Sequence, residues 1–163
     1  MPSKVQRFRI ALYGVLVEEG RVLLTTTRVP SGTITNFPGG GLELGESPLE
    51  AIAREFQEET GLRVTIGELL FCSQSFQQNP EYPAEQLMHI FYRVARIGGE
   101  VVTKGNGDDV AEVSWVPLKD LPSKRILAVD LEFTNHPSFR GLFAQTGQRS
   151  EAPSAILVRR PLT

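Results

Sequence analysis

The sequence predicts an α/β fold, an α+β sandwich in which a mixed β-sheet is flanked by helices. Two β-branched and aliphatic runs precede the clearest helical pattern, and several further strand-like runs follow it before the chain turns helical again. Strands and helices therefore do not alternate one for one, as they would in a sheet of βαβ units. A chain of 163 residues suits one core, so we expect a single domain over residues 1–163.

The first strands are expected at 9–17 and 21–27, joined by a Glu-Glu-Gly turn. A third run, 33–37, meets Pro38 and three glycines, which should end it in a turn. Later strands are expected at 63–66, 69–76, 86–97 and 110–116, with loops at 79–83 and 104–109.

The best helix lies between Ser47 and Gly61. Ser47 suits the N-cap, Pro48 the first helical position, and Glu50 completes a Ser-x-x-Glu capping box. Gly61 fits the left-handed residue that ends many helices. One mostly apolar stripe recurs at helical spacing and consists of Leu49, Ile52, Ala53, Phe56 and Thr60.

The C-terminal forty residues are harder to assign. Helical patterns are expected at 118–131 and 138–144, and 154–159 has the composition of a late strand.

The composition limits the classes of binding partner that we expect. The net charge of −2 gives no bulk reason to bind nucleic acid or an anionic membrane, and no run approaches the roughly 18 apolar residues of a membrane span. Cys72 is the only cysteine, which excludes an intrachain disulfide and a thiolate zinc cluster and favours a buried thiol. The N-terminus is typical of a first strand rather than a signal peptide, so we expect a cytoplasmic protein.

The stretch REFQEETGL crowds like charges onto one flank of the helix. At 100° per residue Glu55, Glu58 and Glu59 share a sector, with Arg54 at its edge. From the helix alone, a solvated face and a cation site are equally good interpretations. Just upstream, however, PGGGLELGE offers backbone carbonyls that a ligand can approach closely. An all-oxygen site is typical of Mg²⁺ or Mn²⁺.

This region resembles the signature of the Nudix hydrolases, G-x5-E-x7-R-E-U-x-E-E-x-G-U, where U is a bulky apolar residue. Paired strands before it and the tract EVSWVPLKDLP after it extend the resemblance to about residues 9–122. The matching positions are Gly40, Glu46, Arg54, Glu55, Phe56, Glu58, Glu59, Gly61 and Leu62.

The resemblance implies cleavage of the pyrophosphate link in a nucleoside diphosphate joined to another group, X. It implies that Glu58 and Glu59 are metal ligands, together with the Gly40 carbonyl. Glu55 is a further ligand or the base that takes a proton from water, and Arg54 orients a glutamate. These side chains should then converge on one cation pocket open to solvent.

Other carboxylates are implied at the edge of the site. Glu46 should lie just outside the metal ligands. Relatives differ in where the base lies, and the downstream candidates are Asp108, Asp109 and Glu112. We favour Glu112 as an extra metal-associated residue, with a plain solvent-facing strand residue as the alternative.

Substrate contacts are expected near the mouth of the site. Arg28 ends a strand and either meets a phosphate or is a surface arginine. Phe37, Tyr82 and Phe76 flank loops, where they stack on a nucleobase or simply pack.

Three ring-bearing residues are interpreted as structural. They are His89 inside a strand pattern, His136 near a helix start and Trp115 at a strand end.

The partner is expected to be a small nucleotide. Gly41 stands where relatives that hydrolyse nucleoside triphosphates often carry lysine, which favours NDP-X compounds such as ADP-ribose or a nucleotide sugar. Asn36, suited to reading a base edge, keeps a modified triphosphate open as the alternative. A non-catalytic nucleotide-binding domain is the other alternative, and pairing of two copies is undecided.

Overall fold

Two β-sheets form the body of the protein. The structure is a computed structural model that describes residues 4–74, 76–123 and 128–144. The first sheet has the order β5 (Gly39–Gly41), β1 (Arg7–Val15), β8 (Glu85–Gly99) and β6 (Leu62–Cys72), with β7 (Gln77–Gln78) also paired to β8. The second contains β2 (Val17–Glu18), β3 (Arg21–Val29) and β4 (Gly32–Asn36), with β9 (Val110–Pro117) also paired to β3.

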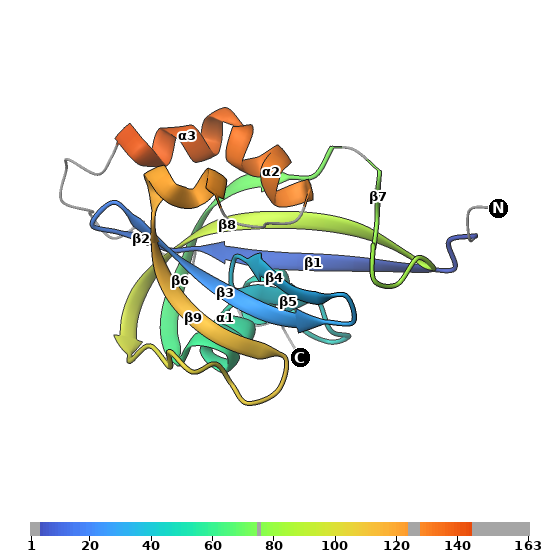
Figure 1. Ribbon diagram of the computed structural model, residues 1–163, viewed down its shortest axis with the longest axis horizontal. Helices are drawn as coiled ribbons and strands as arrows, with labels where there is room; N and C mark the ends of the chain where they lie inside the picture. Colours follow the sequence, from blue (N-terminus) through green and yellow to red (C-terminus); the bar gives the residue numbers. More distant parts are fainter. Residues whose placement is uncertain (1–3, 75, 124–127, 145–163) are drawn as a thin grey trace, which may run out of the picture.

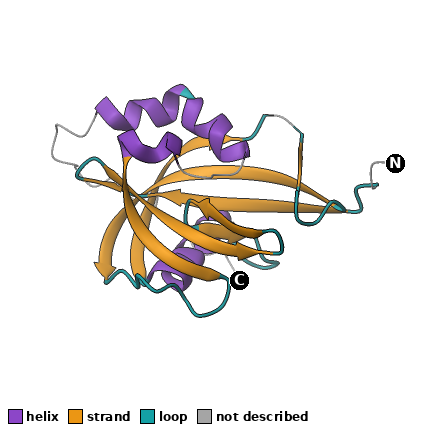
Figure 2. Cartoon of the chain, viewed as in Figure 1, coloured by secondary structure: helices purple, strands orange, loops and turns teal. Residues whose placement is uncertain are grey.

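The first sheet is mixed. Strands β1 and β8 run parallel, from Arg7 opposite Glu85 to Val15 opposite Arg93, whereas β5 and β6 run antiparallel to their neighbours. Helices lie on both sides of the strands (Figures 1 and 2). The predicted α/β sandwich with a mixed sheet is confirmed.

Helix α1 (Pro48–Thr60) lies on one side, and η1 (Leu118–Ser123), α2 (Ala128–Asn135) and α3 (Pro137–Ala144) lie on the other (Figure 1). The capping prediction for α1 is confirmed. Ser47 accepts from the Glu50 N–H, the Glu50 side chain accepts from the Ser47 N–H, and Gly61 ends the helix at φ 77°. The position of α1 is therefore fixed locally at both ends.

The core divides along β1, because successive side chains point to opposite faces of the sheet. Ala11 and Tyr13 join the cluster that contacts α2 and α3, while Leu12 joins the cluster around Phe56 of α1. Gly14 permits the close approach of α1, since a Cβ there would lie 2.8 Å from the Phe56 ring.

Five phenylalanines fill the first cluster. The rings of Phe91 and Phe133 stack with centroids 4.3 Å apart, and both are fully buried. The cluster comprises Phe37, Phe71, Phe91, Phe133 and Phe139.

Several predicted elements differ from the structure. Residues 39–41 form strand β5 rather than a plain turn, because glycines without side chains can pair closely with β1. Residues 63–66 and 69–72 belong to one strand, β6, which ends at Cys72 rather than at the predicted Phe76 and whose register shifts between Ile66 and Leu69. Residues 118–123 are a 3₁₀ helix rather than the start of α2.

Two remaining predictions concern Cys72 and the chain end. Cys72 is half-buried rather than buried, because it ends β6. The strand predicted at 154–159 lies outside the described residues.

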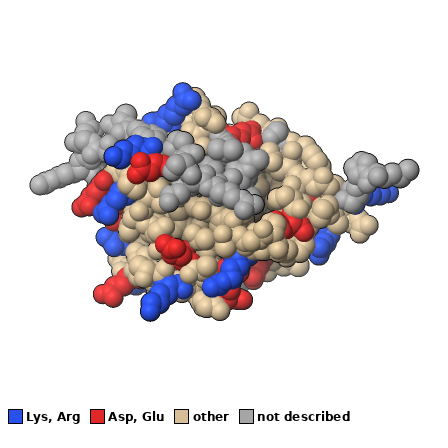
Figure 3. All heavy atoms as spheres, in the orientation of Figure 1, with Lys and Arg blue, Asp and Glu red and all other residues tan. Residues whose placement is uncertain are grey.

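Charged side chains of both signs are mixed on the face shown in Figure 3. Among the described residues, no helix combines the length and apolar character needed to cross a membrane.

Candidate active site

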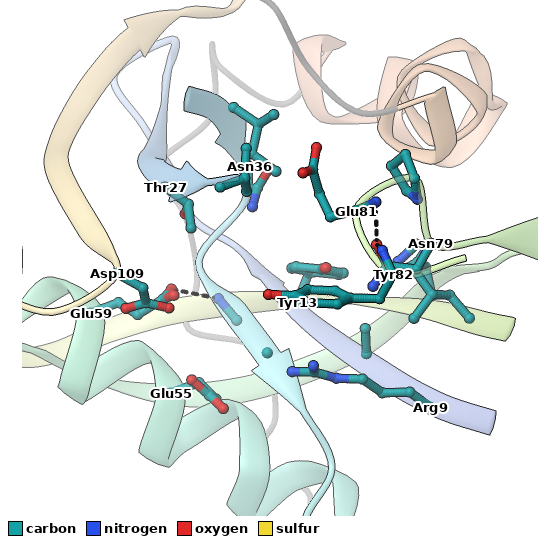
Figure 4. Close-up of a pocket in the computed structure, with 18 residues that line it drawn as sticks. Arg9, Tyr13, Thr27, Asn36, Glu55, Glu59, Asn79, Glu81, Tyr82 and Asp109 are labelled. Carbon is teal, nitrogen blue, oxygen red and sulfur yellow. Dashed lines mark hydrogen bonds between the residues drawn. The ribbon is translucent and has the colours of Figure 1, made fainter. Parts of the chain in front are cut away.

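A pocket of about 240 Å³ opens between the two sheets, with α1 at one end (Figure 4). Glu55 and Glu59 reach it from successive turns of α1, and Asp109 reaches it from the loop before β9. Arg9 lies toward the other end and is the one cationic side chain among the described lining residues. Three carboxylates therefore gather at the α1 end, and a fourth lining carboxylate, Glu81, lies beside Tyr82 away from that end (Figure 4).

Glu59 is the most buried carboxylate of the pocket. It is 7% exposed and accepts a hydrogen bond of 2.8 Å from the Gly39 N–H. Burial raises its pKa to about 8, with repulsion from Glu55 and Asp109 adding to the rise and the Gly39 bond opposing it. A nearby cation would offset both the cost of burying the negative charge and the repulsion between the carboxylates.

Arg54 gathers the other carboxylates. Its guanidinium donates two bonds to Glu46, at 2.8 and 3.0 Å, one of 3.0 Å to Glu55 and one of 3.3 Å to Glu58. The bonds from Arg54 lower the pKa of Glu46, and the same contacts raise the pKa of Arg54. The bidentate pair holds Glu46 outside the pocket, where the sequence placed it.

Glu55 stands between the guanidinium and the pocket. Its burial raises its pKa, and the Arg54 bond opposes this rise. A Cβ placed at Gly40 would lie 2.5 Å from a Glu55 carboxylate oxygen. Glycine at position 40 therefore brings the carboxylate against the backbone of β5.

The predicted convergence of carboxylates is only partly met. Glu55, Glu59 and Asp109 line the pocket, but the Glu58 side chain is 57% exposed and bonded to Arg54. In the described segments, no three His, Cys, Asp or Glu side chains are arranged to hold a metal ion as they stand. Arg54 bonds only Oε1 of Glu55, so the second carboxylate oxygen is the one that has no bond from this guanidinium.

Glu112 is not brought to the pocket. It is exposed on β9, opposite Thr26, and the lining carboxylate from this part of the chain is Asp109. A register shift in the β3–β9 pairing separates the two positions. Asp109 is anchored by its carbonyl, which accepts from the Arg28 N–H at 2.8 Å. The preference for Glu112 is thus corrected in favour of its alternative, a solvent-facing strand residue.

Of the side chains expected to contact substrate, one is buried in the core, two lie outside the pocket lining and one lies at its mouth. Phe37 is 1% exposed within the aromatic cluster, so its ring is unavailable to a base, and the packing alternative holds. Arg28 donates to the Asp108 carbonyl and is absent from the pocket lining. Tyr82 is 52% exposed and lines the mouth, whereas Phe76, also exposed, does not.

Sequence reasoning missed Arg9, Tyr13 and the lining role of His89. Arg9 and Tyr13 lie on β1, and His89 lies on the parallel neighbour β8 opposite Ala11. Alternate residues of a strand point to the same face of the sheet, so all three side chains share one face. Because the pairing partner of β1 is not readable from the sequence, this shared face was hidden. His136, by contrast, contacts Ser138 at a helix start, as its structural interpretation predicted.

Buried Glu59 and half-buried Glu55, held against a glycine strand in a mixed sandwich, are suited to binding a cation. The chain matches the NUDIX domain family over residues 6–136. It therefore belongs to the Nudix hydrolases, which are pyrophosphohydrolases that generally use divalent metal ions, and it is an enzyme of that class.

Individual relatives agree. The chain is 32% identical over 124 residues to an ADP-ribose pyrophosphatase of Methanocaldococcus jannaschii, covering 76% of this chain and 68% of that protein. It is 36% identical over 61 residues to an 8-oxo-dGTP diphosphatase of Escherichia coli, covering 36% and 46%. A Nudix hydrolase structure from Nitrosomonas europaea superposes with TM-score 0.70 at 18% identity, covering 93% and 97%.

Proposed function

We propose that the protein hydrolyses the pyrophosphate link of a nucleoside diphosphate joined to another group, with Mg²⁺ or Mn²⁺ as cofactor. The observation that carries this proposal is the gathering of Glu55, Glu59 and Asp109 at the α1 end of the pocket, with Arg9 as the one cationic side chain among the described lining residues. A diphosphate is repelled by carboxylates alone, so it needs a cation among them and gains attraction from the arginine.

The residues present fit a hard divalent cation. Glu55 and Glu59 offer carboxylate oxygens and Gly40 a backbone carbonyl, the donor set that Mg²⁺ and Mn²⁺ prefer. When bound, the ion neutralises phosphate charge and makes water more acidic. The Nudix resemblance also assigns Glu58 to the ion, and here we place Glu58 at the rim beside Arg54.

The protein groups have distinct roles in this proposal. Glu55, buried enough to have a raised pKa, either joins Glu59 as a ligand of the ion or accepts a proton from the attacking water. Arg54 orients Glu55 and Glu58 through charge-assisted bonds. Arg9 binds substrate phosphate, and Tyr82 at the mouth covers the substrate.

ADP-ribose or a nucleotide sugar is the favoured substrate class. The similarity to the ADP-ribose pyrophosphatase spans 76% of this chain, against 66% for a putative 8-oxo-dGTP diphosphatase of Bacillus subtilis at the same 32% identity, so coverage leans only slightly toward the first class. Gly41, in place of lysine, favours the same class. A modified nucleoside triphosphate is the second candidate, supported by Asn36 in the pocket lining.

The test is hydrolysis of a broad panel of NDP-X compounds and nucleoside triphosphates with Mg²⁺, followed by product analysis. Glu55→Gln and Glu59→Gln should each lower kcat/KM by at least 100-fold while the fold is preserved, and Glu58→Gln should do so too if the rim carboxylate joins the ion. Cleavage of ADP-ribose or a nucleotide sugar ahead of every triphosphate is expected.

Two matched controls use the same substitution elsewhere. Glu68→Gln changes an exposed glutamate on β6, and Glu112→Gln changes the exposed residue on β9. Both should keep full activity. Tight nucleotide binding without cleavage of any compound would instead make this a binding domain, and loss of activity in Glu112→Gln would return that residue to the site.

We also propose that residues 1–163 form a single domain. We further propose that two copies of the chain pair as a homodimer. Light scattering after size-exclusion chromatography distinguishes a dimer from a monomer of 18.0 kDa.

A further inference from the structure

The described side chains contain two buried polar atoms without a hydrogen-bond partner, and both belong to residues of the same pocket. They are Oδ1 of Asn36 and Nδ1 of His89. Buried polar groups are nearly always paired in folded proteins. Two such atoms in one cavity indicate that a polar group, either water or part of a ligand, pairs with them there.

The two residues come from different sheets. Asn36 ends β4 in the second sheet, and His89 lies in β8 of the first sheet. A group held between them would lie between the sheets, where Figure 4 shows Asn36 facing the space above Tyr13. The carboxylates of α1 lie at the other side of this space, so one substrate can reach both.

The backbone around Asn36 is satisfied. Asn36 pairs with Thr25 across β3 and β4, and its carbonyl accepts from the Thr25 hydroxyl at 3.4 Å. The side-chain amide is therefore the part of Asn36 that has an oxygen without a hydrogen-bond partner. Exchanging its O and N would leave a donor unpaired in place of an acceptor, so the amide needs a partner in either orientation.

His89 is 2% exposed and remains neutral at pH 7, because burial and the nearby Arg9 charge lower its pKa to about 4. A neutral imidazole has one donor and one acceptor nitrogen. Its ring lies 5.6 Å from that of Tyr13, which stacks on Phe91 at 5.2 Å. The ring of His89 therefore lies beside an aromatic wall, with Arg9 as the nearby charge.

We propose, on the basis of the proposed function, that Asn36 and His89 recognise the nucleobase of the substrate and determine which base is accepted. A nucleobase is planar, uncharged and edged with donors and acceptors, which matches an aromatic wall with an amide and an imidazole. A phosphate would lie against Arg9 instead. The histidine that the sequence suggested to be structural thus becomes a specificity residue.

The test measures binding of AMP, GMP, CMP and UMP by protein NMR titration in EDTA, where turnover cannot occur. The wild type should prefer one base over the poorest by at least tenfold. In Asn36→Leu and His89→Leu this ratio should fall below threefold. Met88→Leu is the matched control, because Met88 is the strand neighbour of His89 and points to the opposite face, and it should keep the wild-type ratio.

Thermal stability supplies a readout that a packing role would move in the opposite direction. Removing an unpaired buried polar atom should leave the metal-free melting temperature of Asn36→Leu and His89→Leu equal or higher. A lower melting temperature, with all four affinities reduced by the same factor, would make these residues structural and overturn the proposal.

Three further results would also overturn it: no binding of any monophosphate, no base preference in the wild type, or an unchanged ratio in both variants. Ribose 5-phosphate identifies the part of the nucleotide that is read. If the variants weaken its binding as much as that of AMP, the pair recognises the sugar. Because no step requires cleavage, a protein that shows base preference but hydrolyses nothing would refute the proposed function alone.

Discussion

The neutral state of His89 predicts that the contribution of this residue to stability is lost in mild acid. Its folded-state pKa is lowered to about 4, whereas the unfolded chain has an ordinary histidine pKa near 6.5. Between these values the unfolded state binds more protons than the folded state. The His89 contribution to stability is therefore complete above about pH 6.5 and is lost as the pH falls toward 4.

The size of the effect follows from the width of this window. Each unit between the two pKa values corresponds to about 1.4 kcal/mol. Lowering the pH from 8 to 5 should therefore reduce the free energy of unfolding by about 2 kcal/mol through His89 alone. The charged group that acts on the ring is Arg9.

The measurement is urea unfolding of the wild type and His89→Leu at pH 8, 7, 6 and 5, without divalent ions. Carboxylates such as Glu59 titrate in both proteins and cancel in the difference. The wild type should lose about 2 kcal/mol relative to His89→Leu over this range, and Met88→Leu should follow the wild type. Parallel curves for wild type and His89→Leu would show that the ring is not held neutral, which would refute the reasoning.

The remaining predictions test the fold and the metal site. Phe133→Ala should lower the free energy of unfolding by about 3–5 kcal/mol in urea, because its ring is fully buried and stacked on Phe91; a change under about 1 kcal/mol would contradict that packing. Ser47→Ala should cost about 1 kcal/mol by the same measurement, and no loss would argue against the capping box. Millimolar Mg²⁺ should raise the melting temperature of the wild type and raise that of Glu59→Gln less; equal shifts would exclude Glu59 as a ligand.

Local sequence signals predicted the helix that carries the site. Ser47, Glu50 and Gly61 specify the ends of α1 through contacts within a few residues, and the structure reproduces each of them. The spacing of Glu55 and Glu59 places both on one flank of that helix, and both line the pocket. Nothing distant in the sequence was needed for these inferences.

Non-local pairing set the limit of prediction. Whether Asp109 or Glu112 faces the pocket depends on the register of β9 against β3, which shifts near Thr26. The burial of Phe37 depends on α2 and α3 covering it from about a hundred residues away. A loop-flanking aromatic and a downstream carboxylate looked equally suitable for function until these contacts were known.

The parallel pairing of β1 with β8 has a consequence for biosynthesis. The first strand to leave the ribosome cannot complete its hydrogen bonds on that side until β8 has been made, about half a chain later. During this interval β1 can pair only with β5, on one of its two edges. The apolar side chains of β1 then face water or a chaperone. Growth conditions that slow translation through the first half of the gene should therefore increase aggregation of the nascent chain more than slowing the second half does.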